Sequence, residues 1–261
     1  MKGKKAKIIS IANQKGGVAK TTTAVNLSAA LAMAGQKILV IDLDPQGNAS
    51  TGLGLEQHDR AKSIYQVLIG KENIESAILP TKIDGLHLIP SDINLSAAEV
   101  EILSIKDKEY ILKNAFSSSH LSYDYIFIDC PPSLGQLTLN ALSSSMGVII
   151  PMQCEFYALE GLSHLLKIID IVQNNLNKSL KILGVLLTMY DKRNRLTEEV
   201  EADVRKYLGD TVFEVVIPRN VRIAEAPSHG KPVIIYDPSS IGSSSYHALA
   251  REFLNRERLI I

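Results

Sequence analysis

Residues 14–22 read QKGGVAKTT, a short stretch that follows an apolar, β-branched segment and precedes a helical pattern. Gly16 and Gly17 permit a sharp turn with inward-facing backbone NH groups, and a helix beginning near Thr21 adds its own free NH groups and its dipole. Lys20 would then reach the β and γ phosphates of a nucleotide, and the Thr21 hydroxyl would join the shell of a Mg²⁺ ion. The stretch therefore predicts a phosphate loop, with an ordinary glycine-rich turn as the alternative.

Short apolar runs alternate with longer helical patterns along the chain, without repeats or low-complexity linkers. This alternation predicts an α/β fold: a mostly parallel twisted sheet with helices on both faces. We expect strands at 7–12, 37–43, 86–91, 123–129, 147–152, 181–190, 211–218 and 232–237. We expect helices to begin near Thr21, Ser96, Lys108, Leu134, Ala158, Thr197 and Ser243. The length of 261 residues favours one domain over 1–261, with residues 1–6 as a flexible basic N-terminus.

Composition excludes several classes of protein. The 28 basic residues balance the 28 acidic ones, so a nucleic-acid or membrane surface would have to arise from arrangement and not from net charge. The two cysteines, Cys130 and Cys154, form no CxxC pair, which disfavours a disulfide framework, a zinc site and an iron-sulfur cluster. No segment approaches the roughly 18 apolar residues of a membrane span. These features indicate a cytoplasmic protein that is neither exported nor inserted into a membrane.

Carboxylates end two of the expected strands. Asp42 and Asp44 are two residues apart, so they project to the same side if the chain stays extended. Asp129 ends an apolar run and precedes two prolines that force the chain out of the strand, which is a Walker B pattern. In an open parallel sheet the ligand crevice lies outside the carboxyl ends of the strands, beside the phosphate loop. A polar turn after each strand is the alternative interpretation.

The second half of the chain carries a weaker signal. Two loops after apolar strands contain basic residues that could contact phosphates together: Lys192, Arg193, Arg195, Arg219 and Arg222. From residues alone, solvated loops with ion pairs are favoured, because the segment 191–231 holds eight basic and eight acidic residues.

The loop QKGGVAKTT resembles the deviant Walker A loop of the ParA/Soj and MinD superfamily, whose usual form is KGGVGKT. In that family the early lysine, Lys15 here, reaches across a dimer interface to the partner's nucleotide. Gln14 is usual in the ParA branch, whereas Ala19 stands where the family has glycine. The cost of Ala19 depends on the backbone conformation at that position, and the sequence leaves open whether it permits ATP turnover.

Further motifs extend the resemblance to chromosomal ParA/Soj proteins from about Lys7 to Leu254. They are IDLDPQGN (41–48), IDCPPS (128–133), LEGLSHLL (159–166), LLTMYDKRN (186–194) and VIPRNVRIAEAPSHGKPVIIYDP (216–238). The resemblance implies catalytic roles for Lys15, Lys20 and Asp44, with Asp44 positioning the attacking water. It implies nucleotide contacts from Lys15, Gly16, Gly17, Val18, Ala19, Lys20, Thr21, Thr22, Pro218 and Arg219. Thr21 would bind Mg²⁺, with Asp129 and Asp44 acting through water, and Arg193 and Arg222 would bind DNA.

The function implied is an ATPase switch with a weak intrinsic rate that partitions a chromosome or a plasmid. ATP and Mg²⁺ would join a homodimer that binds DNA without reading its sequence, and a ParB-like centromere-binding protein would stimulate hydrolysis and release. The protein would then be cytoplasmic and associated with the nucleoid. Three alternatives stay open: a MinD-like membrane-cycling ATPase, for which the tail REFLNRERLII (251–261) is a weak amphipathic anchor, a metabolic P-loop enzyme, and a variant impaired in ATP use by Ala19.

Overall fold

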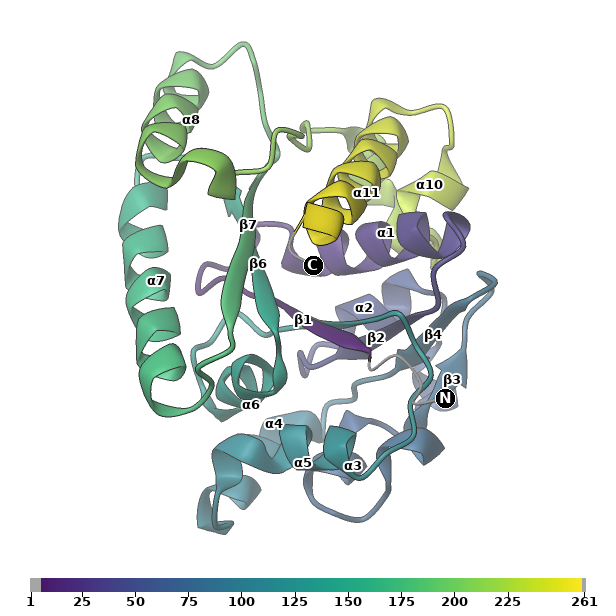
Figure 1. Ribbon diagram of the computed structural model, residues 1–261. Helices are drawn as coiled ribbons and strands as arrows, with labels where there is room; N and C mark the ends of the chain where they lie inside the picture. Colours follow the sequence, from purple (N-terminus) through teal and green to yellow (C-terminus); the bar gives the residue numbers. More distant parts are fainter. Residues whose placement is uncertain (1–5, 260–261) are drawn as a thin grey trace.

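The computed structural model describes residues 6–259, and the side chains of that range as far as residue 257. Most of the expected basic segment 1–6, and Ile260 and Ile261 of the expected tail, lie outside this range. Figure 1 shows a central sheet with helices on both sides. Its strands follow the order β3-β4-β2-β5-β1-β6-β7. They are β1 (Lys7–Ile11), β2 (Ile38–Asp42), β3 (Leu79–Pro80), β4 (Leu86–Ile89), β5 (Tyr125–Asp129), β6 (Gly147–Gln153) and β7 (Lys181–Thr188).

The predicted fold class is confirmed. All neighbouring strands of the sheet pair in parallel except β3, which runs antiparallel to β4. Six of the expected strands form, and the two-residue strand β3 was not expected. The mostly parallel arrangement follows from the α-helical crossovers between successive strands, which keep the strand direction constant.

Alternate residues of each strand enter two separate hydrophobic cores, one on each face of the sheet. In β2, Ile38 and Val40 face one core, while Leu39 and Ile41 face the other. Near-continuous apolar strands of this kind are typical of sheets buried on both faces. The helices of the first face include α1 (Lys20–Met33), α2 (Asn48–Gly52), α9 (Val221–Glu225), α10 (Val233–Tyr236) and α11 (Ile241–Leu259).

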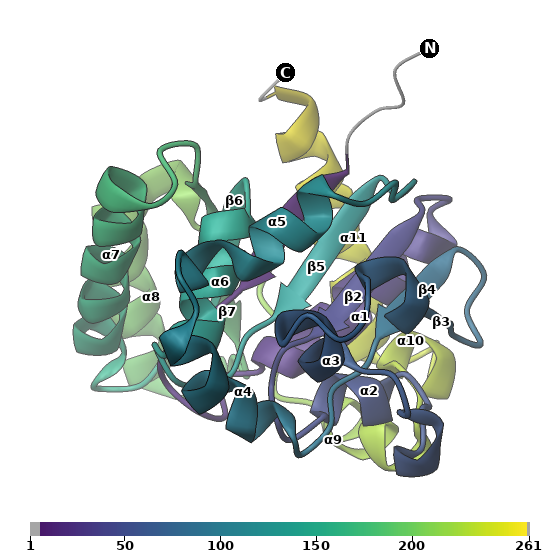
Figure 2. The same cartoon turned by 90° about the horizontal axis from the view of Figure 1, so that it is seen from below.

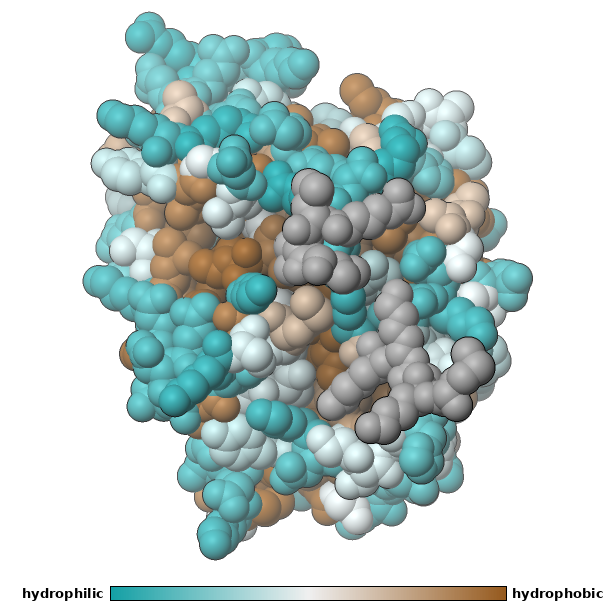
Figure 3. Space-filling view, in the orientation of Figure 1, coloured by the Kyte–Doolittle hydropathy of each residue, from teal (hydrophilic) through white to brown (hydrophobic). Residues whose placement is uncertain are grey.

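The opposite face is covered by the remaining helices, which are α3 (Ile64–Leu68), α4 (Leu95–Glu101), α5 (Ile111–Ser117), α6 (Gln136–Ser144), α7 (Ala158–Asn175) and α8 (Arg195–Leu208). Only Thr197, Val200 and Val204 of α8 are buried, and Figure 3 shows hydrophilic residues over this helix. Short 3-10 turns occur at Gln57–Asp59, Ile74–Ala77, Ile102–Ser104, Lys108–Tyr110, Gly209–Thr211 and Ala226–His229. The helix starts expected near Thr21, Ser96, Leu134, Ala158, Thr197 and Ser243 are confirmed within about two residues.

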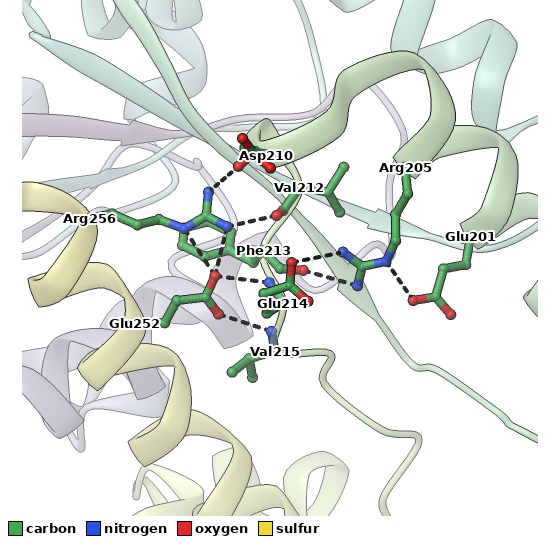
Figure 4. Close-up of polar contacts among 9 residues, drawn as sticks. All are labelled: Glu201, Arg205, Asp210, Val212, Phe213, Glu214, Val215, Glu252 and Arg256. Carbon is green, nitrogen blue, oxygen red and sulfur yellow. Dashed lines mark hydrogen bonds and ion pairs between the residues drawn. The ribbon is translucent and has the colours of Figure 1, made fainter. Parts of the chain in front are cut away.

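The strand predicted at 211–218 is wrong. Within the described chain this segment makes only two isolated bridges, from Val212 to Val185 of β7 and from Pro218 to Tyr190, just after β7. Side chains take the backbone bonds that a ladder would need: Glu252 accepts from the NH groups of Glu214 and Val215. Arg256 donates to the carbonyls of Asp210 and Val212, and Arg205 donates to that of Phe213. Figure 4 shows how these contacts tie the segment to α8 and α11.

The strand predicted at 232–237 is also wrong, because this apolar run forms helix α10. Pro232 precedes its first residue with a φ of −60°, and the NH of Val233 donates to Asn26 Oδ1 at 2.7 Å. Val233 and Ile234 are buried in the core that α1 and α11 share. A short apolar run has no periodicity that distinguishes a buried strand from a buried helix.

The topology places the predicted site at one edge of the sheet. Strand β1 lies between β5 and β6, and β5 lies next to β2, so the carboxyl ends of β1, β2 and β5 are adjacent. In the view of Figure 2, the short helices α2, α4 and α9 lie along the lower edge, toward which β5 ends. The phosphate loop, Asp42 and Asp129 follow directly from these strand ends.

Candidate nucleotide site

The phosphate loop is anchored by hydrogen bonds to residues that lie far from it in the sequence. Asn13 Nδ2 donates to the carbonyl of Pro151 at 2.7 Å, and Asn13 Oδ1 accepts from the NH of Lys15 at 3.0 Å. On the other side, the Thr188 hydroxyl donates to the carbonyl of Val18 at 3.1 Å. The loop between β1 and α1 is therefore held against the ends of β6 and β7.

Two residues of the loop have left-handed backbone conformations, Gly17 with a φ of 73° and Ala19 with a φ of 65°. Glycine adopts this region freely, whereas an L-residue with a Cβ is strained there by about 1–2 kcal/mol. Ala19 is the N-cap of α1, and no side chain caps that helix end. The free NH groups of the first turn stay available to a ligand. Ala19 is thus a strained residue in a loop whose other parts are intact.

Replacing Ala19 by glycine is expected to raise the free energy of unfolding by about 0.5–1 kcal/mol. The left-handed strain disappears, and the larger entropy loss of glycine on folding, about 0.5–1 kcal/mol, offsets only part of the gain. Tm in a calorimetric scan of the nucleotide-free protein should rise by about 2–4 °C per kcal/mol. As a matched control, Ala202→Gly on the exposed face of α8 should lower stability by about 1 kcal/mol. Equal destabilisation by both changes would contradict a left-handed Ala19.

Lys20 is buried at the start of α1, with 6% of its surface exposed. Its Nζ donates to the carbonyl of Lys15 at 3.0 Å, across the turn of the loop. Burial lowers the pKa of Lys20, and the carboxylates of Asp129 and Asp44 act in the opposite direction. A desolvated ammonium group beside the free NH groups of the first turn of α1 is a strong partner for phosphate oxygens.

The two aspartates after β2 have different environments. Asp42 is fully buried and accepts from the NH and the hydroxyl of Ser50, at 2.7 and 2.6 Å, and burial raises its pKa to about 6. It therefore fixes the segment that follows β2. Asp44 lines the cavity described below, and within the described chain its carboxylate accepts only from the NH of Gln46, at 3.0 Å. Asp44 has an oxygen free for a ligand or a water.

Asp129 is fully buried, and neither of its carboxylate oxygens has a hydrogen bond in the described part of the chain. Burial and the neighbouring Asp42 carboxylate raise the pKa of Asp129 well above its usual range, while the Thr21 hydroxyl and Lys20 act to lower it. A buried carboxylate left without donors is costly unless a cation or a water completes it. Thr21 and Asp129 therefore fit a Mg²⁺ ion held directly by the hydroxyl and through water by the carboxylate.

Within residues 6–259 no three His, Cys, Asp or Glu side chains form a metal-binding cluster.

Lys20, Thr21 and Asp44 line a cavity of about 480 Å³ at the carboxyl edge of the sheet, whereas the fully buried Asp42 and Asp129 are not among its lining residues. Of the residues predicted from the sequence, Gly16, Gly17, Ala19, Lys20, Thr21, Thr22 and Asp44 line it. The residues that sequence reasoning missed are Val25, Asn26, Gln46, Asn48, Thr51, Gly52, Pro132, Met189, Pro227 and Lys231. The volume of this cavity lies within the usual range of ligand pockets, and few of its lining residues are charged. Both properties suit a nucleotide.

Four predicted nucleotide-binding residues do not line this cavity: Lys15, Val18, Pro218 and Arg219. Lys15 points away and forms an ion pair with Glu155. Val18 is buried, while the Pro218–Arg219 turn is held next to the end of β7, where the NH of Arg219 donates to the carbonyl of Tyr190 at 3.1 Å. Met189 and Pro227 line the cavity instead of Pro218. The role predicted for Pro218 and Arg219 at the adenine stays a prediction.

The two arginines predicted to bind DNA are exposed but paired with carboxylates. Arg193 makes a two-fold contact with Asp191, at 2.9 and 2.8 Å. Arg222 contacts Glu225 at 2.9 Å and Asp237 at 3.3 Å. Exposed pairs of this kind are weak and exchange readily. Both arginines can contact phosphates, but each would first have to break its ion pair with a carboxylate.

Comparison with known proteins adds independent information. Residues 6–182 match a family described as an AAA domain. The chain is 50% identical over 254 residues to the chromosome partitioning protein ParA of Caulobacter vibrioides, covering 97% of this chain and 95% of the relative. It is 49% identical over 251 residues to the chromosome-partitioning ATPase Soj of Treponema pallidum, covering 96% and 98%. A solved structure of cobyrinic acid a,c-diamide synthase from Mycobacterium smegmatis, with an ATP analog and magnesium bound, is 36% identical, with a TM-score of 0.84 and coverage of 97% and 96%.

Proposed function

Because this chain belongs to the ParA/Soj family of chromosome-partitioning ATPases, we propose that it is a switch whose ATP-bound dimer coats DNA and whose hydrolysis reaction releases it. The observation that carries the proposal is the single cavity in which the loop residues Gly16 to Thr22, except Val18, meet Asp44. Charge neutralisation, metal binding and water orientation are nearly all that phosphoryl transfer to water requires.

The chain's own groups bind and orient the triphosphate in this proposal. The NH groups of the loop and of the first turn of α1 donate to phosphate oxygens, and Lys20 neutralises charge on the β and γ phosphates. Mg²⁺, when bound, neutralises charge that develops on the phosphates during transfer. Thr21 would hold it directly and Asp129 through water, and the Asp44 carboxylate would orient the attacking water.

The surface around Lys15 supports the proposed homodimer. Lys15 and Glu155 are each 43% exposed, so their ion pair is weak and can give way to a phosphate of a partner copy. Next to Glu155, the aromatic residues Phe156 and Tyr157 pack edge to face and are 73% and 69% exposed. Exposed aromatic side chains beside an exposed cation are typical of an association surface.

DNA is the proposed partner of the basic loops after β7 and before α9. Lys192 and Arg193 lie in the first loop, Arg219 lies in the second, and Arg222 lies in the first turn of α9. Lys192 and Arg219 have no ion pair within the described side chains. A ParB-like centromere-binding protein is the proposed stimulator of hydrolysis. We place the protein in the cytoplasm, on the nucleoid, as part of the same proposal.

Arg222→Glu is expected to weaken binding of random-sequence DNA by about tenfold or more at moderate salt, with the ATP dimer intact. The change removes a phosphate contact and adds repulsion, so the slope of log affinity against log salt should fall by about 1 for each lost contact. Anisotropy of a labelled duplex measures this. The matched control is Lys181→Glu, the same charge change at the exposed amino end of β7, which should bind DNA normally. Equal loss in both variants would assign the effect to net charge.

Two other functions are less well supported. A MinD-like membrane cycle would need a tail free to enter a bilayer, yet Phe253 of α11 is buried against Tyr125 and Phe127. No helix within the described range is long and apolar enough to cross a membrane. A metabolic role, as in the synthase of 36% identity, is opposed by the higher identity to partitioning proteins. ATP-dependent binding to liposomes, or turnover that requires a small-molecule substrate, would favour these alternatives.

The test of the proposal is anisotropy of a labelled random-sequence duplex with ATP, ADP or no nucleotide, at two salt concentrations. Salt-sensitive binding with ATP alone is the expected result. Absence of binding under all conditions would be followed by the same titration with Ala19→Gly. Recovery would identify the methyl group of Ala19 as the cause, and continued absence would contradict the DNA switch.

A further inference from the structure

Arg60 lies behind the segment that carries Asp44, in a position that the function above does not use. It is only 9% exposed. Its NH1 donates to the carbonyls of Gly47 and Ser91 at 3.2 and 3.4 Å, and its NH2 donates to the Thr51 hydroxyl and the Leu55 carbonyl, each at 2.8 Å. A single guanidinium group thus joins four places in the chain. They are the turn after Asp44 at Gly47, the end of helix α2 at Thr51, the loop at Leu55, and Ser91, which follows β4.

The turn at Gly47 depends on this arrangement. Gly47 has a φ of 63°, and a Cβ at this position would lie 2.3 Å from Arg60 NH1 and 3.3 Å from the Ser91 carbonyl. The Gly47 carbonyl can approach the guanidinium closely only because no side chain intervenes. From the opposite side, Asp42 holds Ser50, whose hydroxyl accepts from the NH of Ser91 at 3.1 Å.

The segment between these two anchors forms one wall of the nucleotide cavity. Asp44, Gln46, Asn48, Thr51 and Gly52 all line it. Arg60 itself does not line that cavity; it lines a neighbouring cavity, which shares Gln46 and Thr51 with the first. Its influence on the nucleotide must pass through the segment 44–52.

The charge of Arg60 has no obvious structural purpose. Its partners in the described part of the chain are three carbonyls and a hydroxyl and no carboxylate, and its Nε is buried without a hydrogen bond. Burying a cation without a counter-ion is expensive. What the guanidinium offers here is geometry: a rigid planar fork that reaches four acceptors at once, which an ammonium group cannot do.

We propose that Arg60 is a positioning residue for hydrolysis, which fixes the 44–52 segment so that the Asp44 carboxylate stands at the attacking water. This inference rests on the proposed role of Asp44. It assigns Arg60 to the chemical step and not to nucleotide binding, because the phosphates are bound by a loop that Arg60 does not contact. Misplacement of a catalytic group by about 1 Å can cost about 100-fold in rate.

Arg60→Lys tests the proposal, because lysine keeps the charge but loses the fork. Single-turnover hydrolysis of ATP with Mg²⁺ should slow by about 10- to 100-fold, while ATP affinity in calorimetry changes by less than about threefold, a difference of about 0.7 kcal/mol. Arg256→Lys is the matched control, since Arg256 also donates to two backbone carbonyls, on the far α11 side. It should lower Tm without changing the hydrolysis rate. Thr51→Val removes one acceptor and provides a milder variant if Arg60→Lys does not fold.

The outcomes separate the inference from the function it rests on. An unchanged hydrolysis rate in Arg60→Lys, or a parallel loss of ATP affinity and rate, would overturn the positioning role. Asp44→Ala is measured in the same experiment. If Asp44→Ala hydrolyses ATP normally, the proposed role of Asp44 fails; if it is inactive while Arg60→Lys is normal, only the inference about Arg60 fails.

Discussion

Lys20→Ala is expected to bind ATP about 100-fold more weakly or worse, a loss of about 3 kcal/mol. The ammonium group is desolvated, lies inside the loop and has only the Lys15 carbonyl as a hydrogen-bond partner in the described chain. Without it, the negative charge of the triphosphate would enter a cavity that also contains the Asp44 carboxylate. Repulsion then adds to the lost contact. Isothermal titration calorimetry with ATP and Mg²⁺ measures the affinity directly.

Unfolding is not expected to explain this loss. Removal of a buried cation relieves a desolvation cost, so the nucleotide-free Lys20→Ala protein should keep a Tm close to that of the parent. Lys15→Ala is the matched control because Lys15 is exposed and does not line the cavity. It should bind ATP normally as a monomer but fail to dimerise. Unchanged ATP affinity in Lys20→Ala would show that residues 14–22 are not the phosphate loop.

The sequence predicted those strands well whose apolar pattern is contained within a few neighbouring residues. Within the predicted ranges 37–43 and 123–129, the apolar runs that end in Asp42 and Asp129 form β2 and β5 as expected. The failures at 211–218 and 232–237 share one cause. Both runs are apolar and β-branched, but their partners lie far away in sequence: Glu252 and Arg256 for the first, Asn26 for the second. Tertiary contacts of this kind override strand propensity.

The site divides in the same way. Gly16, Lys20, Thr21 and Asp44 belong to compact motifs, and they meet in the cavity because parallel strands end at one edge. Asn26, Met189 and Lys231 line the same cavity but come from α1, the loop after β7 and the segment before α10. No short spacing connects these residues. Met189, with a φ of 49°, is the one whose strained backbone marks it in the structure.

Ala19 shows what a motif alone does not reveal. The sequence allowed a cost of zero if the backbone were helical at that position. The left-handed conformation, with a φ of 65° and a ψ of 32°, instead makes this the position where glycine is preferred. The glycine that the family has at this position therefore has a conformational reason. Alanine in its place strains the loop but removes none of the backbone NH groups that could donate to phosphate.

Asp44→Ala is expected to slow ATP hydrolysis by about 100-fold or more while ATP still binds, which is the usual range for loss of a group that orients or activates a nucleophile. In the part of the chain that the structure describes, the Asp44 carboxylate has one hydrogen bond, from the NH of Gln46, whereas the Asp42 carboxylate accepts two from Ser50. Removing Asp44 should leave the buried anchor at Asp42 intact and the 44–52 segment folded. The ATP-bound dimer should then persist, because the reaction that ends it is blocked.

Gel filtration with ATP and Mg²⁺, together with single-turnover hydrolysis, measures both consequences. The Asp44→Ala protein should elute as a dimer for much longer than the parent, and it should retain DNA over the same period. Asp59→Ala, an exposed carboxylate in the turn that follows the segment, is the matched control and should behave like the parent. A monomer that still hydrolyses ATP would remove Asp44 from the water site. In that case the carboxylate chemistry would have to come from Asp129, whose two carboxylate oxygens have no hydrogen-bond donor in the described chain.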